Sequence, residues 1–375
     1  QLTDSALLVT LVGFFGMGPM LILGTVGGLL ADKTDKRKLL VITASANLIA
    51  STFMTALLYF GEVKFWHAYL VIVVSGIGWG LDFPSRRSIV LDILGRARLT
   101  NAVALDSIGM HTSRMIGPAL GGMLITAVGI EGGYVVATIF YSLSVFFMII
   151  VSIPQITLVS RATKSTTTSI LRNLVEGFGY VRSNNTLSAL ILITILMNFL
   201  LFPYQQLIPV IAERVLNVDA GLMGLLLAAE GLGAMVGAIF IASRRTISYH
   251  GRIYLYGSLL ALVMLSILSI SDVYKASLFI LFILGLGAAC FGTMQGTIAM
   301  LVSREDMRGR ALGIVTLGIG ASPLGSLAIG AMADITSAPT AIGVNSIIGL
   351  ATVGLVGLIY NSIRGPMITD ESSND

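Results

Sequence analysis

Long apolar stretches separated by short polar segments dominate this sequence. Most of them are long enough to cross the roughly 30 Å hydrocarbon core of a bilayer, for which about 20 helical residues suffice. We read eleven of them, at residues 6–30, 39–60, 68–84, 102–128, 134–153, 186–211, 221–242, 253–271, 276–302, 311–335 and 341–361. The pattern predicts an all-α polytopic membrane protein.

Lys and Arg are distributed unequally between alternate connecting segments. One set of segments carries most of the cations, whereas the other set carries only Lys64, Arg214 and Lys275. Because positively charged loops stay in the cytoplasm, we expect the basic segments and the C-terminus to be cytoplasmic. The sequence therefore predicts a multi-pass protein of the cell (inner or plasma) membrane.

Composition excludes several classes of function. Charged residues make up 11% of the chain, against about 25% in soluble domains. The net charge of +4 is spread over short loops and does not indicate nucleic-acid binding. The single Cys290 permits no internal disulfide, and no cofactor, metal or nucleotide-binding motif is found. We expect no enzymatic activity.

The two halves of the chain resemble each other. Residues 114–122 can be aligned with residues 319–327, which pairs Pro118 with Pro323. In this register the stretch 186–211 has no partner in the first half, so its partner would lie before Gln1. We predict two pseudo-symmetric six-helix bundles whose first helix is missing from this chain, a repeat typical of secondary transporters. The alternative is that Gly-Pro pairs simply recur in membrane helices.

This repeat sets the expected domains. Residues 1–153 form the N-terminal bundle with five of its six helices, and residues 186–362 form the C-terminal bundle of six. Between them, residues 154–185 are a cytoplasmic linker in which apolar positions of 169–182 recur at helical spacing, as in a helix lying at the membrane surface. Residues 363–375 are a cytoplasmic tail.

A basic segment follows the first apolar stretch. It reads Gly-Leu-Leu-Ala-Asp-Lys-Thr-Asp-Lys-Arg-Lys over residues 28–38 and resembles the loop between helices two and three of the major facilitator superfamily. Asp35 stands where that family has a second Gly. The resemblance implies a cytoplasmic gate motif made of Gly28, Asp32, Lys33, Lys36 and Arg37, with Asp82 at the end of its span as a further member. The alternative is an ordinary cluster of topogenic charges.

The resemblance narrows to one branch of that superfamily. Residues 99–107, 114–122, 176–182 and 209–214 are similar to macrolide efflux pumps and enterobactin-type siderophore exporters. The segment 114–122 is also similar to the helix-five signature of superfamily antiporters, although Ser113 replaces its leading Gly. Small residues let helices approach closely and Pro bends them, so the motif suits either a moving gate or static packing. Its members are Arg114, Gly117, Pro118, Gly121 and Gly122.

Few ionisable side chains lie within the apolar stretches. Such residues are costly in a bilayer and mark functional sites. Glu230 is the deepest carboxylate, ten residues into its span, and is the leading candidate for proton coupling. Asp106 and His111 are secondary candidates. The alternative for Glu230 is a structural role, with its carboxylate bonded to Ser, Thr or backbone groups.

Amide, aromatic and Met side chains gather on two spans. Such residues suit a large, partly apolar ligand, although they also serve as packing. Pro203 and Pro209 predict a broken helix, the usual wall of a midplane site. The substrate-cavity candidates are Asn198, Phe202, Tyr204, Gln205, Met294 and Gln295.

Together these features predict a secondary active transporter of the major facilitator fold. We expect a monomer in the lipid bilayer that exports amphipathic small molecules of drug, macrolide or siderophore type by alternating access, coupled to protons. One alternative is an uptake symporter for a small organic solute. Another is a non-transporting membrane scaffold or receptor, which the short loops disfavour.

Overall fold

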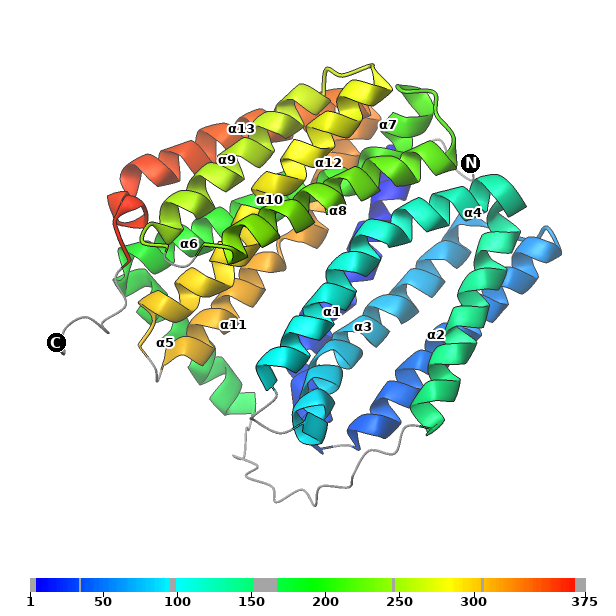
Figure 1. Cartoon of the computed structure of the whole chain (residues 1–375), viewed down its shortest axis with the longest axis horizontal. Coiled ribbons are helices and arrows are strands. Elements are labelled where there is room, and N and C mark those ends of the chain that lie inside the picture. Colours follow the sequence, from blue (N-terminus) through cyan, green and yellow to red (C-terminus); the bar gives the residue numbers. More distant parts are fainter. Residues whose placement is uncertain are drawn as a thin grey trace. The chain divides into compact units, whose positions relative to one another are not determined.

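The computed structural model describes residues 5–33, 35–94, 99–150, 167–244, 247–304 and 307–367. These residues are almost entirely helical and contain no β-strand (Figure 1). They form two compact units. The first comprises residues 1–163 with 218–224, and the second comprises residues 164–217 with 225–375.

The first unit is built from four long helices. They are α1 (Ala6–Lys33), α2 (Lys36–Tyr59), α3 (Phe65–Leu94) and α4 (Leu99–Ile150). Helix α3 packs against both α1 and α2, and α4 packs against α2 (Figure 1). The approach of α1 to α3 is tight, because a Cβ on Gly76 would lie 2.2 Å from the carbonyl oxygen of Gly16. Small residues at such crossings allow backbones of membrane helices to touch.

Helix α4 contains a sharp break at Gly129. The φ angle there is +75°, a conformation that Gly adopts without steric cost and other residues rarely adopt. The expected spans 102–128 and 134–153 therefore follow each other directly as two legs of one kinked element, rather than being joined by a loop.

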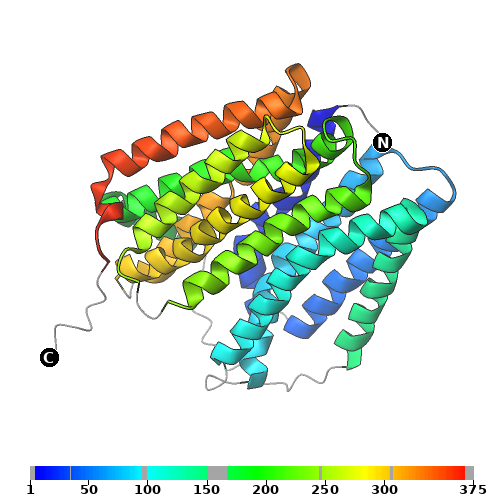
Figure 2. The same ribbon diagram turned by 45° about the horizontal axis from the view of Figure 1, so that its top comes forward.

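The second unit contains the remaining helices. In chain order they are α5 (Thr167–Ser183), α6 (Asn185–Leu196), η2 (Met197–Leu201), η3 (Phe202–Leu207), α7 (Ile208–Arg214), α8 (Ala220–Ala242), α9 (His250–Leu268), α10 (Tyr274–Val302), α11 (Arg308–Ile319), α12 (Ser322–Ile335), α13 (Ala338–Ile359) and η5 (Asn361–Arg364). The first turn of α8 belongs to the first unit. Helix α9 packs against both α10 and α13 (Figure 2).

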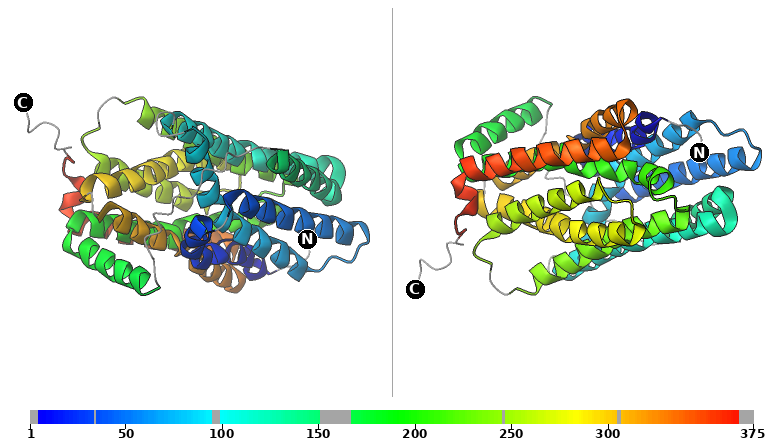
Figure 3. Two further views of the ribbon diagram at one scale, coloured as in Figure 1. Left: turned by 90° about the horizontal axis from the view of Figure 1, so that it is seen from below. Right: turned by 90° about the horizontal axis from the view of Figure 1, so that it is seen from above.

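Helix α5 occupies the segment in which an amphipathic surface helix was expected. It packs against α11 (Figure 3), where the Glu176 carboxylate and the Arg310 guanidinium form an ion pair of 3.0 Å. The Tyr180 hydroxyl accepts a hydrogen bond of 3.0 Å from the Arg304 backbone N–H. Val175 and Phe178 remain 72% and 62% exposed, so α5 keeps an apolar face outside the packed interior.

The described residues confirm an all-α membrane protein. Nine of their helical segments are long and apolar enough to cross a bilayer, and Ala6–Pro19 is a shorter apolar helix. One of the nine, Thr112–Ile150, runs through the break at Gly129 and covers both legs of α4. The total of eleven spans stays a prediction.

Candidate functional site

The span that runs from α6 to α7 is irregular at its centre. The Asn184 side chain caps the start of α6 by accepting hydrogen bonds from the next helical N–H groups. After Leu196 the chain forms one π-helical turn (η2) and then a 3₁₀ segment (η3) before α7 begins. Pro203 and Pro209 lie in this region, and Pro has no N–H to donate to a regular helix. The broken helix expected from these two prolines is present, and π-helical turns are frequent at functional sites.

Thr194 is the centre of a buried polar network just before this break. Its hydroxyl is 2.9 Å from the Tyr254 hydroxyl and accepts a hydrogen bond of 3.0 Å from Nε2 of Gln295. The Tyr254 hydroxyl donates to the Leu190 carbonyl oxygen at 3.1 Å. Nδ2 of Asn198 donates to the Thr194 carbonyl oxygen at 2.9 Å. The network joins α6, α9 and α10 and brings together two of the expected cavity residues, Asn198 and Gln295.

Aromatic rings line the side of this network. The Phe291 ring stacks on the Tyr254 ring with centroids 5.2 Å apart, and the Phe202 ring lies 5.6 Å from that of Phe291. Met294 follows Phe291 by three residues on α10 and is 2% exposed. The cluster thus packs buried amide and hydroxyl groups against aromatic rings and a thioether, and its role as a substrate site stays a prediction.

Glu230 of α8 contacts the same broken span. Nε2 of Gln205 donates a hydrogen bond of 2.8 Å to Oε1 of Glu230. The fully buried Tyr204 side chain interacts electrostatically with the Glu230 carboxylate, and its hydroxyl has no hydrogen-bond partner within the part of the chain that is described. Glu230 is itself buried. The Glu230 carboxylate is therefore a buried acidic group held against the broken span, as expected for a functional residue within a membrane.

The backbone beneath Glu230 is fixed by a close helix crossing. A Cβ on Gly285 of α10 would lie 2.1 Å from the Glu230 carbonyl oxygen, and one on Gly233 would lie 1.9 Å from that of Phe282. Contacts this short admit no side chain. The two glycines therefore set the position from which the Glu230 side chain extends.

The helix-five motif lies on the first leg of α4 in the first unit. A Cβ on Gly122 would lie 2.2 Å from the Ala220 carbonyl oxygen, and the Pro118 carbonyl oxygen approaches Gly224 equally closely. Gly117 and Gly121 have no heavy atom within 4 Å of such a Cβ. Only part of the motif therefore serves close packing against residues 218–224.

Arg114 of the same motif has an exposed side chain. The secondary proton-coupling candidates Asp106 and His111 lie outside the residues whose side chains are described, so their role stays a prediction.

The gate motif is described only in part. The side chains of Gly28, Asp32, Lys33 and Lys36 lie outside the described residues. Arg37 donates from Nε to the Met148 carbonyl oxygen at 3.3 Å and from Nη2 to the Ile149 carbonyl oxygen. This basic residue thereby ties the start of α2 to the end of α4.

Two carboxylates of the gate region have local partners. Asp82 forms an ion pair with Arg86 one turn later on α3, and a partly exposed pair of this kind adds little stability. Asp35 is the N-cap of α2, accepting hydrogen bonds from the Arg37 N–H at 3.0 Å and the Lys38 N–H at 3.4 Å. The residue that departs from the family pattern thus begins a helix, a role for which Asp is among the preferred residues.

Sequence reasoning missed Thr194, Tyr254 and Phe291. Thr194 and Asn198 are four residues apart and share a helix face, so this pair could have been found. Tyr254 lies on a span distant in sequence, and no periodicity or spacing places its hydroxyl against Thr194. The missed residues are those that join the expected ones into a single cluster.

We expect Tyr254→Phe to lower the free energy of unfolding of the protein in detergent by about 1–2 kcal/mol. The change leaves the buried Leu190 carbonyl oxygen and the Thr194 hydroxyl each short of one partner, and an unsatisfied buried group costs about this much. Thermal unfolding measures it. Tyr256→Phe is the matched control, because Tyr256 lies on the same helix and is 57% exposed. Equal melting temperatures for the two variants would show that the network contributes nothing.

The comparison with protein families identifies the chain. Residues 1–374 match the family described as transmembrane secretion effector. The chain belongs to this family. The match spans both units and confirms the resemblance read from the sequence.

Curated proteins similar to this chain include transporters and exporters. The Staphyloferrin A transporter of Staphylococcus aureus is 22% identical over 99% of this chain and 91% of its own length. Macrolide efflux protein A of Streptococcus pyogenes is 21% identical over 83% of this chain and 77% of its own. Enterobactin exporter EntS of Salmonella typhimurium is 24% identical, with coverage of 96% and 86%. Secondary transport of small molecules across a membrane is therefore its function.

Solved structures agree on the fold. A crystal structure of a mutant of the peptide transporter POT, in complex with sulfate, superimposes with a TM-score of 0.76 at 13% sequence identity. The match covers 96% of this chain and 87% of that one. With the family match, this likeness shows that the chain has the major facilitator fold.

Proposed function

We propose that this protein is a proton-coupled exporter of amphipathic small molecules that works by alternating access. The observation that carries the proposal is the buried Glu230 carboxylate, bonded to Gln205 of the broken span in a member of the secretion effector family. The siderophore and macrolide relatives support export of drug-like, macrolide or siderophore-like substrates. No cofactor enters this mechanism, and the protein performs no enzymatic reaction.

Glu230 is the proposed proton carrier. In its charged form it accepts the hydrogen bond of Gln205. The buried Tyr204 hydroxyl, which has no hydrogen-bond partner among the described residues, would donate a second one after a small rotation. In its neutral form it keeps one acceptor oxygen for Gln205 and can release its proton when the site opens to the cytoplasm. A proton that crosses 100 mV contributes about 2.3 kcal/mol, enough to drive export against a gradient.

The substrate site is proposed beside this carboxylate. Asn198 and Gln295, both bonded to Thr194, offer amide groups that bind without a fixed charge. Phe202, Tyr204 and Met294 offer apolar surface that tolerates different shapes. Phe202 and Tyr204 lie within three residues of Gln205, which is hydrogen-bonded to Glu230, so substrate entry beside them and the loss of the proton are proposed to be coupled.

Orientation and organisation complete the proposal. The C-terminus and the basic segments are cytoplasmic, the protein is a monomer of the cell membrane, and residues 1–153 and 186–362 are the two bundles that alternate. The basic residues Lys33, Lys36 and Arg37 close the cytoplasmic side with the carboxylates of the gate motif. The ion pair of Asp82 with Arg86 supports a charged cluster in that region.

Accumulation measurements in efflux-deficient bacteria test this proposal. Cells that express the protein should hold several-fold less ethidium, erythromycin or catecholate chelator than cells that express Glu230→Gln. A protonophore should remove the difference. Unchanged accumulation of all three probes would contradict export, and higher accumulation in expressing cells would indicate an uptake symporter.

A further inference from the structure

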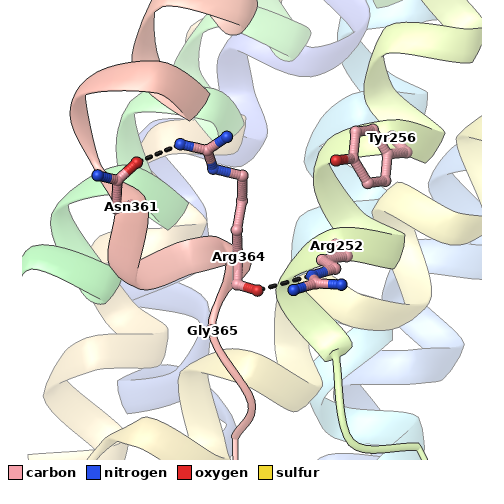
Figure 4. A pocket seen from close by; sticks show the side chains of 5 residues that line it. All are labelled: Arg252, Tyr256, Asn361, Arg364 and Gly365. Carbon is pink, nitrogen blue, oxygen red and sulfur yellow. Dashed lines mark hydrogen bonds between the residues drawn. The ribbon is translucent and has the colours of Figure 1, made fainter.

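A basic pocket lies at one end of the second unit, apart from the polar network. It has a volume of about 500 Å³ and lies between the first turns of α9 and the η5 segment after α13. Figure 4 shows its lining, which is formed by Arg252, Tyr256, Asn361, Arg364 and Gly365. Two guanidinium groups therefore border one open cavity.

Both guanidinium groups are held in place by neutral partners. Nε of Arg252 donates to the Arg364 carbonyl oxygen at 2.8 Å, and the Arg252 guanidinium lies over the Tyr249 ring at 4.1 Å from its centroid. Nη2 of Arg364 donates to Oδ1 of Asn361 (Figure 4). Neither arginine pairs with a carboxylate within the described ranges. Their charges are therefore not neutralised by the part of the protein that is described, and other N–H groups stay available.

The backbone segment that carries Arg364 is tightly packed against the start of α9. The Ile363 side chain is fully buried, and a Cβ on Gly251 would lie 1.9 Å from the Ile363 carbonyl oxygen. The Met367 N–H donates to the Ser248 carbonyl oxygen at 2.8 Å. The pocket is thus a preformed feature of the unit rather than the chance position of two long side chains.

An apolar stripe leads away from the pocket along the membrane-spanning part of α9. Side chains at successive helical turns are exposed: Tyr256 by 57%, Leu260 by 38%, Val263 by 38% and Ile267 by 39%. Their spacing of four, three and four residues places them on one face. A soluble anion would use the arginines only, whereas a phospholipid would use the arginines and the stripe together.

We propose that this pocket binds the phosphate headgroup of an anionic phospholipid, with an acyl chain along the α9 stripe. Arginine suits this role because its planar fork binds phosphate oxygens in pairs. Basic pockets at the cytoplasmic ends of membrane helices recognise such headgroups. The bound lipid bridges α9 and η5 and fastens the C-terminal segment to the bundle.

Lipid binding to the purified protein in detergent tests the proposal by native mass spectrometry and by melting temperature. Phosphatidylglycerol should bind and raise the melting temperature, whereas phosphatidylcholine should do neither. Arg364→Gln should weaken phosphatidylglycerol binding about fivefold, and the double variant with Arg252→Gln about 25-fold, since each arginine near a membrane surface contributes a similar amount. Arg244→Gln is the matched control, because Arg244 is an exposed arginine of the same unit that lies over the Phe240 ring.

The outcomes distinguish a lipid headgroup from a soluble phosphate as the ligand of the pocket. Equal binding by the double variant and the wild type, or equal binding of the two lipids, would overturn the proposal. Tighter binding of glycerol phosphate than of phosphatidylglycerol would also overturn it, because the acyl chain would then contribute nothing and a soluble anion would be the ligand. If the double variant does not fold, lipid binding by the single variant Arg364→Gln is the test. This variant should fold, because the side-chain hydrogen bond that it removes is local, to Asn361 of the same short segment. The test needs no transport, so its failure leaves the proposed function intact.

Discussion

Glu230→Gln should abolish proton-driven transport while leaving substrate exchange intact. Glutamine has nearly the same shape and can still accept the hydrogen bond from Gln205, but it cannot bind and release a proton. A proton that crosses 100 mV supports a concentration ratio of roughly fiftyfold, and the variant should lose this ratio. Vesicles that contain the purified protein would be given a pH gradient, and uptake of ethidium or erythromycin would be followed.

Two further variants make this test specific. Glu213→Gln removes an exposed carboxylate on α7 and should transport as the wild type does. Glu230→Asp keeps a carboxylate but shortens the side chain by one methylene, which lengthens the 2.8 Å contact with Gln205, so we expect partial coupling. Full gradient-driven transport by Glu230→Gln would remove Glu230 from the coupling mechanism and leave it the structural role considered from the sequence.

Gly285→Ala should destabilise the protein by about 1–3 kcal/mol and lower its transport rate. The new Cβ would lie 2.1 Å from the Glu230 carbonyl oxygen, so α8 and α10 must separate, and overpacking of this kind has about this cost. Alanine is the better helix former, so a loss of stability cannot come from helix propensity. Thermal unfolding in detergent and transport in vesicles would both be measured.

The matched control for this change lies on the same helix. A Cβ on Gly292 meets no heavy atom within 4 Å, so Gly292→Ala should keep or slightly raise the melting temperature. Equal stability of the two variants would mean that the α8 and α10 backbones are not in contact near Glu230. The position of the carboxylate would then need another explanation.

Much of the fold could be predicted because the bilayer constrains the sequence strongly. A span must be apolar over about 20 residues, so the helices could be located from hydropathy alone. The break in the span from α6 to α7 was predictable as well, since Pro203 and Pro209 remove two backbone donors. The interruption between 102–128 and 134–153 was predicted too, but not that the two legs follow each other directly through Gly129 without a loop.

The candidate site was only half predictable. Because polar side chains are rare in apolar stretches, the sequence indicated Glu230, Gln205 and Gln295 as separate candidates. Their partners depend on how distant spans pack. Glu230 accepts a hydrogen bond from the amide of Gln205, a partner on another span that no sequence spacing indicates. Thr194 and Tyr254, which organise the polar network, are residue types too common in membrane helices for composition to single them out.

Hydrogen bonds of this network are placed where water does not compete. Interhelical bonds between Thr, Tyr and amide side chains in membranes contribute about 0.6–2 kcal/mol each, so the bonds of Thr194 join three spans without making them rigid. A substrate with donors and acceptors of its own could exchange for some of these bonds at small cost. For this physical reason the proposed substrate site would accept more than one ligand.

Simultaneous recording of substrate and proton movement shows whether the protein exchanges protons for substrate. Vesicles that contain the purified protein and a pH-sensitive dye in the lumen would receive erythromycin, ethidium or a catecholate chelator on the outside, without an imposed pH gradient. The account predicts that entry of a transported probe moves protons outward, and that Glu230→Gln abolishes this proton signal. Entry of the probe with no proton movement, or with protons that move in the same direction, would contradict it.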